Sequence, residues 1–222
     1  SHFVKDLGVQ VVGGCCGTTH EHIRQLVSAV GALSPPPRSF DFVPGASSLY
    51  QASPFQTTPP PILIGERTNA NGSKLFRDLL VKEDWEGMVA MGRDQVREQA
   101  HMLDVCVAYA GRNEAADMSE LIRRFNTQVS IPLVLDTTET PVIEEALQRI
   151  GGKAIVNSIN LEDGEERLAT VVGLCKRYGA AVIALTIDEN GMAKPAQAKL
   201  AVERRIYDLA VVKYGMKPHD LI

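Results

Sequence analysis

Residues 62–222 alternate short apolar segments with amphipathic helical patterns, and this alternation constrains the fold more than any other feature of the sequence. The spacing of the apolar residues predicts where the strands and helices lie. The expected strands are 62–64, 102–107, 133–135, 154–156 and 181–187, and the expected helices are 85–100, 114–128, 141–149, 164–178 and 196–214. The final residues, Asp220-Leu221-Ile222, are expected to begin a sixth strand. Such alternation indicates an α/β fold with a parallel sheet covered by helices.

Two architectures satisfy this pattern. Because crossovers between parallel strands are right-handed, the chain forms either an open, doubly wound sheet or part of an eightfold βα barrel. A complete barrel takes about 250 residues, and the alternating region is shorter than that. The residues by themselves leave a five-stranded open sheet and a truncated barrel as alternatives.

A proline-rich stretch divides the chain into three parts. Most of the 12 prolines lie between Ser34 and Pro61, where no helical or strand periodicity is visible. This composition is typical of a solvated, semi-rigid linker. We therefore expect an N-terminal part over 1–33, a linker over 34–61 and a longer domain over 62–222.

The N-terminal part is predicted to contain one strand, one turn and one helix. An apolar run at 9–12 precedes a glycine-rich turn, and a capping box from Thr18 to Glu21 begins a helix that Gly31 ends. So short a segment cannot bury both faces of a strand. We expect it to be the last strand–helix unit of a larger fold.

Composition excludes several classes of protein. The net charge of −4, with scattered Lys and Arg, gives no basic surface for nucleic acid or an anionic membrane. No apolar run reaches the roughly 18–20 residues of a membrane span, and the first residues lack the features of a signal peptide. Four cysteines at irregular spacing do not form a disulfide framework, so a cytoplasmic location is expected.

Polar residues follow or close four of the predicted strands and lie within the second, towards the strand ends where both architectures place their active sites. They are Glu66 to Gly72, Asp104, Asp136-Thr137-Thr138, Asn157-Ser158 and Asp188-Glu189-Asn190. Each alone is also typical of a turn or a helix cap. Together, carboxylates and amides without a Lys or His partner suit a neutral heterocycle that presents hydrogen-bond donors and acceptors. Phosphate binding would favour a glycine-rich loop with a Lys, which the sequence lacks.

Cys15 and Cys16 form a second candidate site. Two thiols in a glycine-rich turn before a helix could hold zinc, and a helix N-terminus favours the thiolate. The alternative is a pair of small hydrophobic residues packed beside the turn. Two cysteines do not complete a tetrahedron, so a third ligand would come from elsewhere; His20 and His22 are within reach by sequence. Core packing is expected for Cys106 and Cys175.

The chain resembles the cobalamin-dependent methionine synthase family at two places. Gly13-Gly14-Cys15-Cys16-Gly17-Thr18-Thr19 is similar to the end of that family's homocysteine-binding barrel. The segments 64–73, 135–138, 155–159 and 181–191 are similar to its pterin-binding barrel. The order of these segments and the proline-rich linker between them also agree with the family.

The resemblance implies a fold, an activity and a set of site residues. The fold would be a (β/α)8 pterin-binding barrel, incomplete in this chain and preceded by the last βα unit of the homocysteine-binding barrel. The activity would be methyl transfer from 5-methyltetrahydrofolate, by way of cob(I)alamin, to zinc-bound homocysteine, which gives methionine and tetrahydrofolate. The implied pterin residues are Asn69, Asp136 and Asn157, the last two also catalytic, with Ala70 and Asn71 lining the pocket and Glu66 and Asp104 at equivalent strand ends. Cys15 and Cys16 would be two of three zinc ligands.

The sequence also departs from the family. The third zinc-binding Cys, a further pterin-binding Asp after the sixth strand, and the cobalamin-binding module of the same parent protein are not in this chain. We therefore expect little or no turnover from the isolated segment. The alternatives are a corrinoid-protein:methyltetrahydrofolate methyltransferase, a dihydropteroate synthase, which would need basic residues for pyrophosphate, and a non-catalytic folate-binding fragment.

Overall fold

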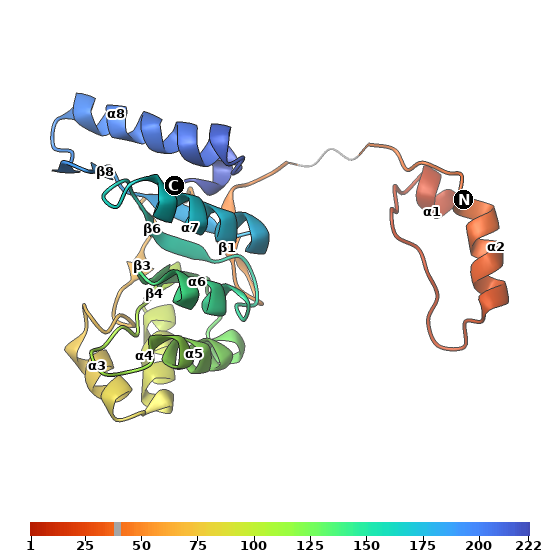
Figure 1. Ribbon diagram of the computed structural model, residues 1–222. Coiled ribbons are helices and arrows are strands. Elements are labelled where there is room, and N and C mark those ends of the chain that lie inside the picture. The colour runs from red at the N-terminus through yellow and green to blue at the C-terminus, as the bar shows by residue number, and fades with distance from the viewer. Residues whose placement is uncertain (38–40) are drawn as a thin grey trace. The chain divides into compact units, whose positions relative to one another are not determined.

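The computed structural model describes residues 1–37 and 41–222, which divide into two compact units, Ser1–Val43 and Pro44–Ile222 (Figure 1). The first unit contains helices α1 (His2–Lys5) and α2 (His20–Val30). The prediction of a strand at 9–12 is wrong, because these residues form no regular element. A strand needs a neighbour to satisfy its backbone groups, and no described residue of this unit forms one.

Helix α2 begins and ends close to the predicted positions. Its capping box is formed by Thr19 and His22, one residue later than expected from Thr18 and Glu21, and Gly31 ends the helix. None of its residues is buried, and the apolar side chains of Ile23 and Val27 are 40% and 59% exposed. An apolar helix face left in solvent fits the expectation that this segment cannot bury its own core.

The second unit alternates strands and helices as the sequence predicts. Its strands are β1 (Gly45–Ser47), β2 (Ala52–Pro54), β3 (Ile64–Gly65), β4 (Met102–Val105), β5 (Leu133–Asp136), β6 (Ile155–Ile159), β7 (Ala181–Ala184), β8 (Ile187–Asp188) and β9 (Gly191–Met192). Its helices are α3 (Lys74–Val81), α4 (Trp85–Arg97), α5 (Glu114–Gln128), α6 (Thr140–Leu147), α7 (Glu165–Tyr178) and α8 (Ala196–Tyr207), followed by helical turns at Asp208–Lys213 and Pro218–Asp220.

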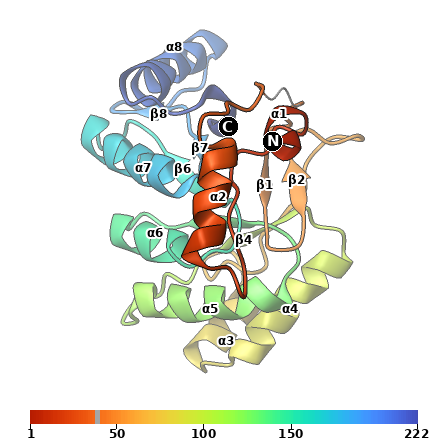
Figure 2. The same ribbon diagram turned by 90° about the vertical axis from the view of Figure 1, so that its right-hand side faces the viewer.

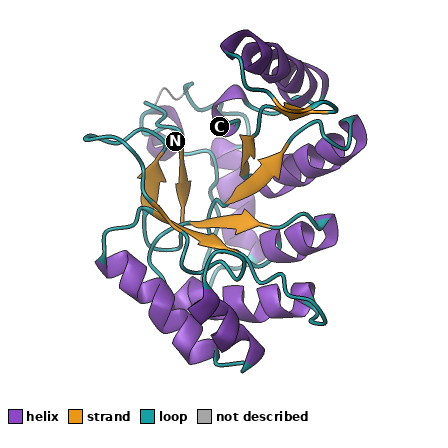
Figure 3. Ribbon diagram, turned by 90° about the vertical axis from the view of Figure 1, so that its left-hand side faces the viewer, coloured by secondary structure: helices purple, strands orange, loops and turns teal. Residues whose placement is uncertain are grey.

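The five strands β3 to β7 form one parallel sheet in chain order. This order, without a reversal, is that of a barrel wall and distinguishes it from a doubly wound sheet. Helices α3 to α8 follow one another along the outside of the strands (Figures 2 and 3). The fold is therefore of the barrel type, and over the described residues the barrel is not closed.

The predicted sixth strand begins where the sequence places it. Leu221 pairs with Val182 of β7 in parallel, and the Ile222 N–H donates to the Val182 carbonyl at 2.9 Å. The Ala184 N–H donates in turn to the Ile222 carbonyl at 2.8 Å. The sheet thus continues past β7 in the same order.

Several strands differ from the expected bounds by a few residues, and two regions differ in kind. Helix α3 was not predicted, although Ser73 caps it and Phe76 and Leu80, four residues apart, are fully buried. The expected strand at 181–187 ends at Ala184, and its last residue belongs to a separate hairpin of β8 and β9. No helix in the described parts of the chain is long and apolar enough to cross a membrane.

The expectation of an irregular linker over 34–61 is wrong between residues 45 and 54. Strands β1 and β2 form an antiparallel hairpin there, and Ser47 forms a bridge with Lys153 just before β6. Side chains of the hairpin also reach the residues that precede other strands: the Ser48 hydroxyl donates to the Ser130 carbonyl at 2.6 Å, and the Ser53 hydroxyl to the His101 carbonyl at 3.0 Å. The hairpin therefore belongs to the barrel unit.

The hairpin closes the amino-terminal end of the barrel interior. A small hydrophobic cluster, which we call the barrel floor, joins it to the first residues of four strands. The cluster consists of Ala46, Met102, Val134, Ile155 and Ala181, all buried. The neighbouring residues of the same strands face the helices instead, because side chains of a strand alternate between its two faces.

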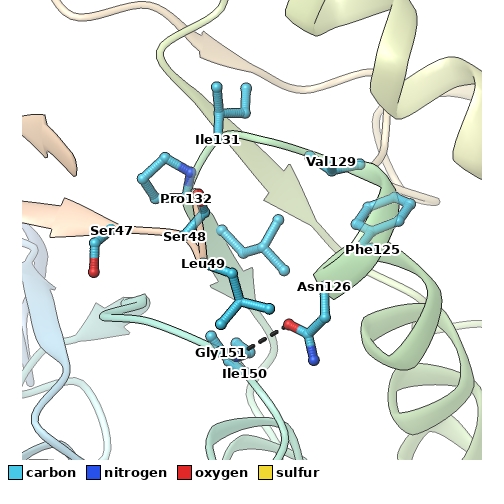
Figure 4. A pocket seen from close by; sticks show the side chains of 11 residues that line it. Ser47, Ser48, Leu49, Phe125, Asn126, Val129, Ile131, Pro132, Ile150 and Gly151 are labelled. Atoms are coloured by element: carbon cyan, nitrogen blue, oxygen red, sulfur yellow. Dashed lines mark hydrogen bonds between the residues drawn. The ribbon is translucent and has the colours of Figure 1, made fainter. Parts of the chain in front are cut away.

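The loop of the hairpin is seated between the end of α5 and the residues before β6 (Figure 4). Leu49 lines this narrow pocket with Phe125 and Ile150, and Asn126 accepts a hydrogen bond from the Gly151 N–H at 3.0 Å. The pocket lies at the amino-terminal end of the strands. It is therefore a packing contact of the floor and not the candidate functional site.

The fit of the hairpin gives a stability prediction. Gly152 has φ 130°, and a Cβ placed there would lie 2.3 Å from the Ser47 carbonyl oxygen. We expect Gly152→Ala to lower the free energy of unfolding by about 3 kcal/mol, because both the backbone angle and the hairpin contact are lost. Urea denaturation measures the change.

Gly173→Ala is the matched control. Gly173 lies inside α7, and a Cβ there meets nothing within 4 Å, so alanine should stabilise the protein by about 0.5–1 kcal/mol. Equal stability of the Gly152→Ala variant and the unmodified chain would contradict the packing of the hairpin against the barrel.

Candidate functional site

The polar strand-end residues lie directly above the barrel floor. Asp104, Asp136 and Asn157 each follow a floor residue of the same strand by two positions, so each points to the same inner face, one layer closer to the carboxyl ends. In the sheet register Asp136 lies opposite Asn157, whereas Asp104 lies opposite Val134 and is therefore one layer deeper. The barrel interior thus changes from apolar to polar within one step along the strands.

The side-chain amide of Asn69 connects the two carboxylates. Its Nδ2 donates to Asp104 Oδ2 at 2.7 Å and to Asp136 Oδ2 at 2.6 Å. Its Oδ1 accepts the backbone N–H groups of Asn71 at 2.8 Å and Gly72 at 3.2 Å. Both amide hydrogens and both carbonyl lone pairs of this side chain are therefore engaged. Asn69 fixes the two carboxylates in place, and it keeps no unused hydrogen-bonding group for a ligand.

Asp104 is the most buried carboxyl group of the site, with 9% of its surface exposed. Burial raises the pKa of Asp104, while hydrogen bonds from Asn69 and Asn157 oppose the rise; the negative charges of Asp136 and Glu66 raise it further. Asp136 is more exposed than Asp104. The Asn69 amide donates to its Oδ2, which leaves Oδ1 to accept hydrogen bonds from a ligand. Asp136 is accordingly the carboxylate best placed to accept hydrogen bonds from a ligand.

The remaining candidate residues lie on the loop that follows β3. Ala70 is fully buried, its N–H donates to the Cys106 carbonyl at 2.9 Å, and its carbonyl accepts from Arg77 at 2.9 Å. Asn71 is exposed, and its Nδ2 contacts the Cys106 sulfur at 3.4 Å. Glu66 is exposed as well. The structure thus brings Asn69, Asp104, Asp136 and Asn157 together, with Asn71 and Glu66 at the rim and Ala70 in the supporting core.

Gln95 is a supporting residue that the sequence reasoning missed. It is 4% exposed, and its Oε1 accepts the Arg67 N–H at 2.9 Å, which holds the loop after β3 against α4. A Cβ at Gly65 would lie 2.5 Å from that same oxygen, so glycine leaves the space that Gln95 occupies. The available signal was a polar residue among the core-facing positions of a predicted helix.

The polar end of the fifth predicted strand forms a separate structure. Asp188 accepts the Asn190 N–H at 2.9 Å and pairs with Arg205 at 3.2 Å. Its carboxylate thereby closes the β8–β9 turn and holds it to α8. This is the turn-forming role that the sequence left as an alternative for each strand end.

Cys15 and Cys16 are exposed, and their sulfur atoms lie 3.8 Å apart. Two thiolates that share a tetrahedral zinc at about 2.3 Å are themselves about 3.8 Å apart, so this spacing fits one edge of such a site. Hydrogen bonds from Cys16 lower the pKa of the Cys15 thiol. Cys16 lines a hollow of ≈ 310 Å³ together with Gly14 and His22.

A third ligand does not join the pair within the described residues. No group of three His, Cys, Asp or Glu side chains suited to a metal is present among them. The ring of His22 serves as part of the α2 cap, where its Nδ1 accepts the Thr19 N–H at 3.1 Å. The two thiols therefore fit zinc in type and spacing, and they supply two of the ligands that a tetrahedral site needs.

The four thiols are expected to differ in reactivity. Burial raises the pKa of Cys106 to about 11 and of Cys175 to about 12, whereas the pKa of Cys15 is lowered. Since the thiolate is the reacting form, iodoacetamide at pH 8 should label Cys15 and Cys16 in the folded chain and leave the buried pair unmodified. Peptide mass spectrometry locates the labels, with urea-denatured protein as the control in which all four react. Labelling of Cys106 or Cys175 in the folded chain would contradict their burial.

Known proteins resemble this chain in two segments. The profile of the family described as Pterin binding enzyme matches residues 65–222, which is most of the chain and includes the whole candidate site. The chain belongs to the pterin-binding enzyme family. The profile described as Homocysteine S-methyltransferase matches residues 1–30, which include the cysteine pair.

Curated relatives contain both segments in one protein. Methionine synthase of Mycobacterium tuberculosis is 43% identical over 99% of this chain, and that of Mycobacterium leprae is 43% identical over 96%. The chain spans only 19% and 18% of their lengths. It is therefore similar to a segment of methionine synthase, and both family profiles match within that segment.

Solved structures share the barrel. The dihydropteroate synthase of Xanthomonas albilineans, in complex with indole-2-carboxylic acid and 6-chloroguanine, superposes with a TM-score of 0.56 at 18% identity, covering 81% of this chain and 64% of that one. The enzyme of Vibrio fischeri ES114 gives 0.55 at 11% identity, covering 80% and 65%. At these identities the likeness concerns the pterin-binding barrel as a fold, and it confirms the predicted fold class.

Proposed function

We propose that this segment binds 5-methyltetrahydrofolate in a longer protein that transfers the methyl group, by way of a cobalamin, to homocysteine. The products are methionine and tetrahydrofolate. The observation that carries the proposal is the presence of two features in one chain: a carboxylate–amide site in a pterin-binding barrel, and a vicinal cysteine pair in a segment similar to homocysteine S-methyltransferases. A cytoplasmic location is part of the same proposal.

The geometry at the strand ends supports pterin binding. Asp136 accepts the Asn69 amide through Oδ2, and its other oxygen can accept N–H groups from a pterin ring. Asn157, opposite Asp136 in the register, offers one donor group and one acceptor group. A carboxylate beside an amide matches the amino and ring N–H edge of a pterin better than it matches an anion.

Asp136 and Asn157 are also suited to the difficult step of the reaction, which is the departure of the methyl group from N5 of the folate. A tertiary amine leaves poorly until it is protonated, so a site that supports methyl transfer from N5 must favour the protonated amine. Asn157 can accept a hydrogen bond from that N–H, directly or through water, and the nearby carboxylates favour a positive charge. The residues described here include no histidine at this layer, and the proton would reach N5 from solvent.

Cys15 and Cys16 would hold zinc together with a third ligand from outside the described residues. When bound, zinc lowers the pKa of the homocysteine thiol and orients its sulfur. The exposed pair, the spacing of 3.8 Å and the adjoining hollow support this assignment. The cobalamin-binding module of the parent protein would be the partner that faces both barrels.

Other members of the fold class receive less support. A stand-alone corrinoid-protein methyltransferase has no use for the homocysteine methyltransferase segment at residues 1–30. A dihydropteroate synthase must hold pyrophosphate, whereas the inner layer here consists of carboxylates and amides. A non-catalytic folate-binding fragment would bind the pterin and carry no zinc.

One assay separates these alternatives. The purified full-length protein is supplied with 5-methyltetrahydrofolate, reduced cobalamin and homocysteine, and methionine is measured by mass spectrometry alongside the zinc content. We expect methionine only when all three compounds are present, and one zinc per chain that Cys16→Ser removes. The 222-residue segment alone is expected to show little or no turnover. Formation of 7,8-dihydropteroate and pyrophosphate from a 7,8-dihydropterin pyrophosphate and 4-aminobenzoate, without methionine, would overturn the proposal.

A further inference from the structure

A guanidinium group connects the loop that follows Asp136 to the strand that carries Asn157. Arg167, on the first turn of α7, donates from Nη1 to the Ser158 carbonyl at 3.3 Å and from Nη2 to the Thr138 carbonyl at 3.3 Å. Ser158 follows Asn157 directly, and Thr138 lies two residues after Asp136. A single half-buried side chain thus joins the loop after β5 to strand β6.

The sheet itself leaves the Ser158 peptide available. The pairing of β6 with β7 runs from Asn157 opposite Ile183 to Ile159 opposite Ala184, so the register skips Ser158. A bulged residue loses its place in the ladder, and its polar groups need other partners. Arg167 supplies one for the Ser158 carbonyl, directly after Asn157, which lies opposite Asp136 in the register.

The location of Arg167 on its helix is unfavourable by itself. The amino-terminal turn of a helix carries a partial positive charge, and the other charged residues of that turn, Glu165 and Glu166, have the favourable sign. The guanidinium of Arg167 is a cation in the same turn, and its hydrogen bonds to two carbonyl groups offset the unfavourable charge interaction. The arrangement is therefore explained by what Arg167 holds and not by helix stability.

We propose that Arg167 is a positioning residue for pterin binding: its guanidinium ties the peptide that follows Asn157 to the loop that follows Asp136, and so holds the two side chains in position for the ligand. It does not touch the pterin itself. This inference rests on the proposed function and adds a residue of α7 that lies outside every strand-end motif. Around metal sites, groups that orient the ligating residues contribute about 10-fold to 100-fold in affinity, and we expect an effect at the lower end of that range for Arg167.

The test compares two arginines of one helix in the full-length protein. Arg167→Ala should weaken binding of 5-methyltetrahydrofolate, measured by calorimetry, by about 10-fold. Arg177→Ala is the control: Arg177 lies in the last turn of α7, pairs with Glu144 at 3.2 Å and should leave the affinity unchanged. The melting temperature of each variant is recorded, because a merely structural role would lower it without a selective loss of affinity.

Each outcome has a defined meaning. Equal affinity of Arg167→Ala and the unmodified protein overturns this inference, and so does a loss of affinity that Arg177→Ala shares. If the alanine variant does not fold, Arg167→Lys replaces it. Lysine keeps the charge but cannot span both carbonyl groups, so we expect an affinity at least about threefold weaker. An unchanged affinity of the lysine variant overturns the inference. Failure of the unmodified protein to bind the folate would instead contradict the proposed function.

Discussion

Replacing Asp136 by alanine in the full-length protein is expected to weaken 5-methyltetrahydrofolate binding by about 100-fold or more. Asp136 is the more exposed carboxylate of the inner layer, and hydrogen bonds from a ligand to a charged group are worth roughly 1.5–3 kcal/mol each. A pterin edge that donates two such bonds therefore accounts for the loss. Calorimetric titration of each protein with the folate measures it.

Two variants serve as controls for Asp136→Ala. Asp94→Ala removes a carboxylate from the exposed face of α4, where Asp94 pairs only locally with Arg97, and should leave the affinity unchanged. Asp136→Asn keeps the shape and one acceptor oxygen but removes the charge, so its affinity should lie between the other two. If Asp136→Ala folds and binds as tightly as the unmodified protein, Asp136 does not contact the ligand.

Replacing Asn157 by alanine should affect the reaction more than binding. In the proposed function Asn157, opposite Asp136 in the register, accepts a hydrogen bond from the protonated N5, and the unprotonated substrate has no N5 proton to make this contact. Loss of one such group typically costs about 100-fold to 1000-fold in rate. In the full-length protein we expect a rate of methyl transfer to reduced cobalamin that is at least about 100-fold slower, with affinity reduced about 10-fold.

Gln148→Ala is the amide control for Asn157→Ala. Gln148 lies at the exposed end of α6, where its Nε2 contacts the Tyr178 hydroxyl at 3.2 Å, and its removal should leave the rate unchanged. Stopped-flow absorbance of the cobalamin follows the single turnover in both variants. An unchanged rate for Asn157→Ala would show that the proton on N5 is stabilised by other groups.

The order of elements in the barrel could be predicted because each strand is a short apolar run and each helix shows its own periodicity. Sheet order, the begun sixth strand and the helices from α4 to α8 follow that pattern. The alternation of inward and outward side chains along each strand also predicts which residues line the barrel interior. Residues at every second position from Met102, Val134 and Ile155 point inwards, so the same parity that builds the floor places Asp104, Asp136 and Asn157 above it.

The β1–β2 hairpin could not be predicted in the same way. Its strands are three residues long and lie in a region rich in Pro and Ser, and their partners are Lys153, Ser130 and His101, distant in the sequence. Their stability comes from packing against the floor, which local composition does not encode. Residues 9–12 form no strand for a related reason, since no described segment pairs with them.

The candidate site residues could be named from the sequence, and their role in ligand binding stays a prediction. Strand-end positions identified Asn69, Asp104, Asp136 and Asn157, and the structure brings these four together. Only the geometry shows that the Asn69 amide is fully engaged, which makes it a support for two carboxylates. Gln95 and Arg167 act across elements that are distant in the sequence, and no local motif marks them.

The central claim is that the inner layer of this barrel binds a pterin. Its most direct test is a calorimetric titration of 5-methyltetrahydrofolate into the 222-residue chain and into a longer protein that carries the rest of the barrel. The account predicts that the longer protein binds one equivalent and that the shorter chain binds more weakly or not at all. A longer protein that is folded by circular dichroism and does not bind the folate would contradict the assignment of Asp136 and Asn157.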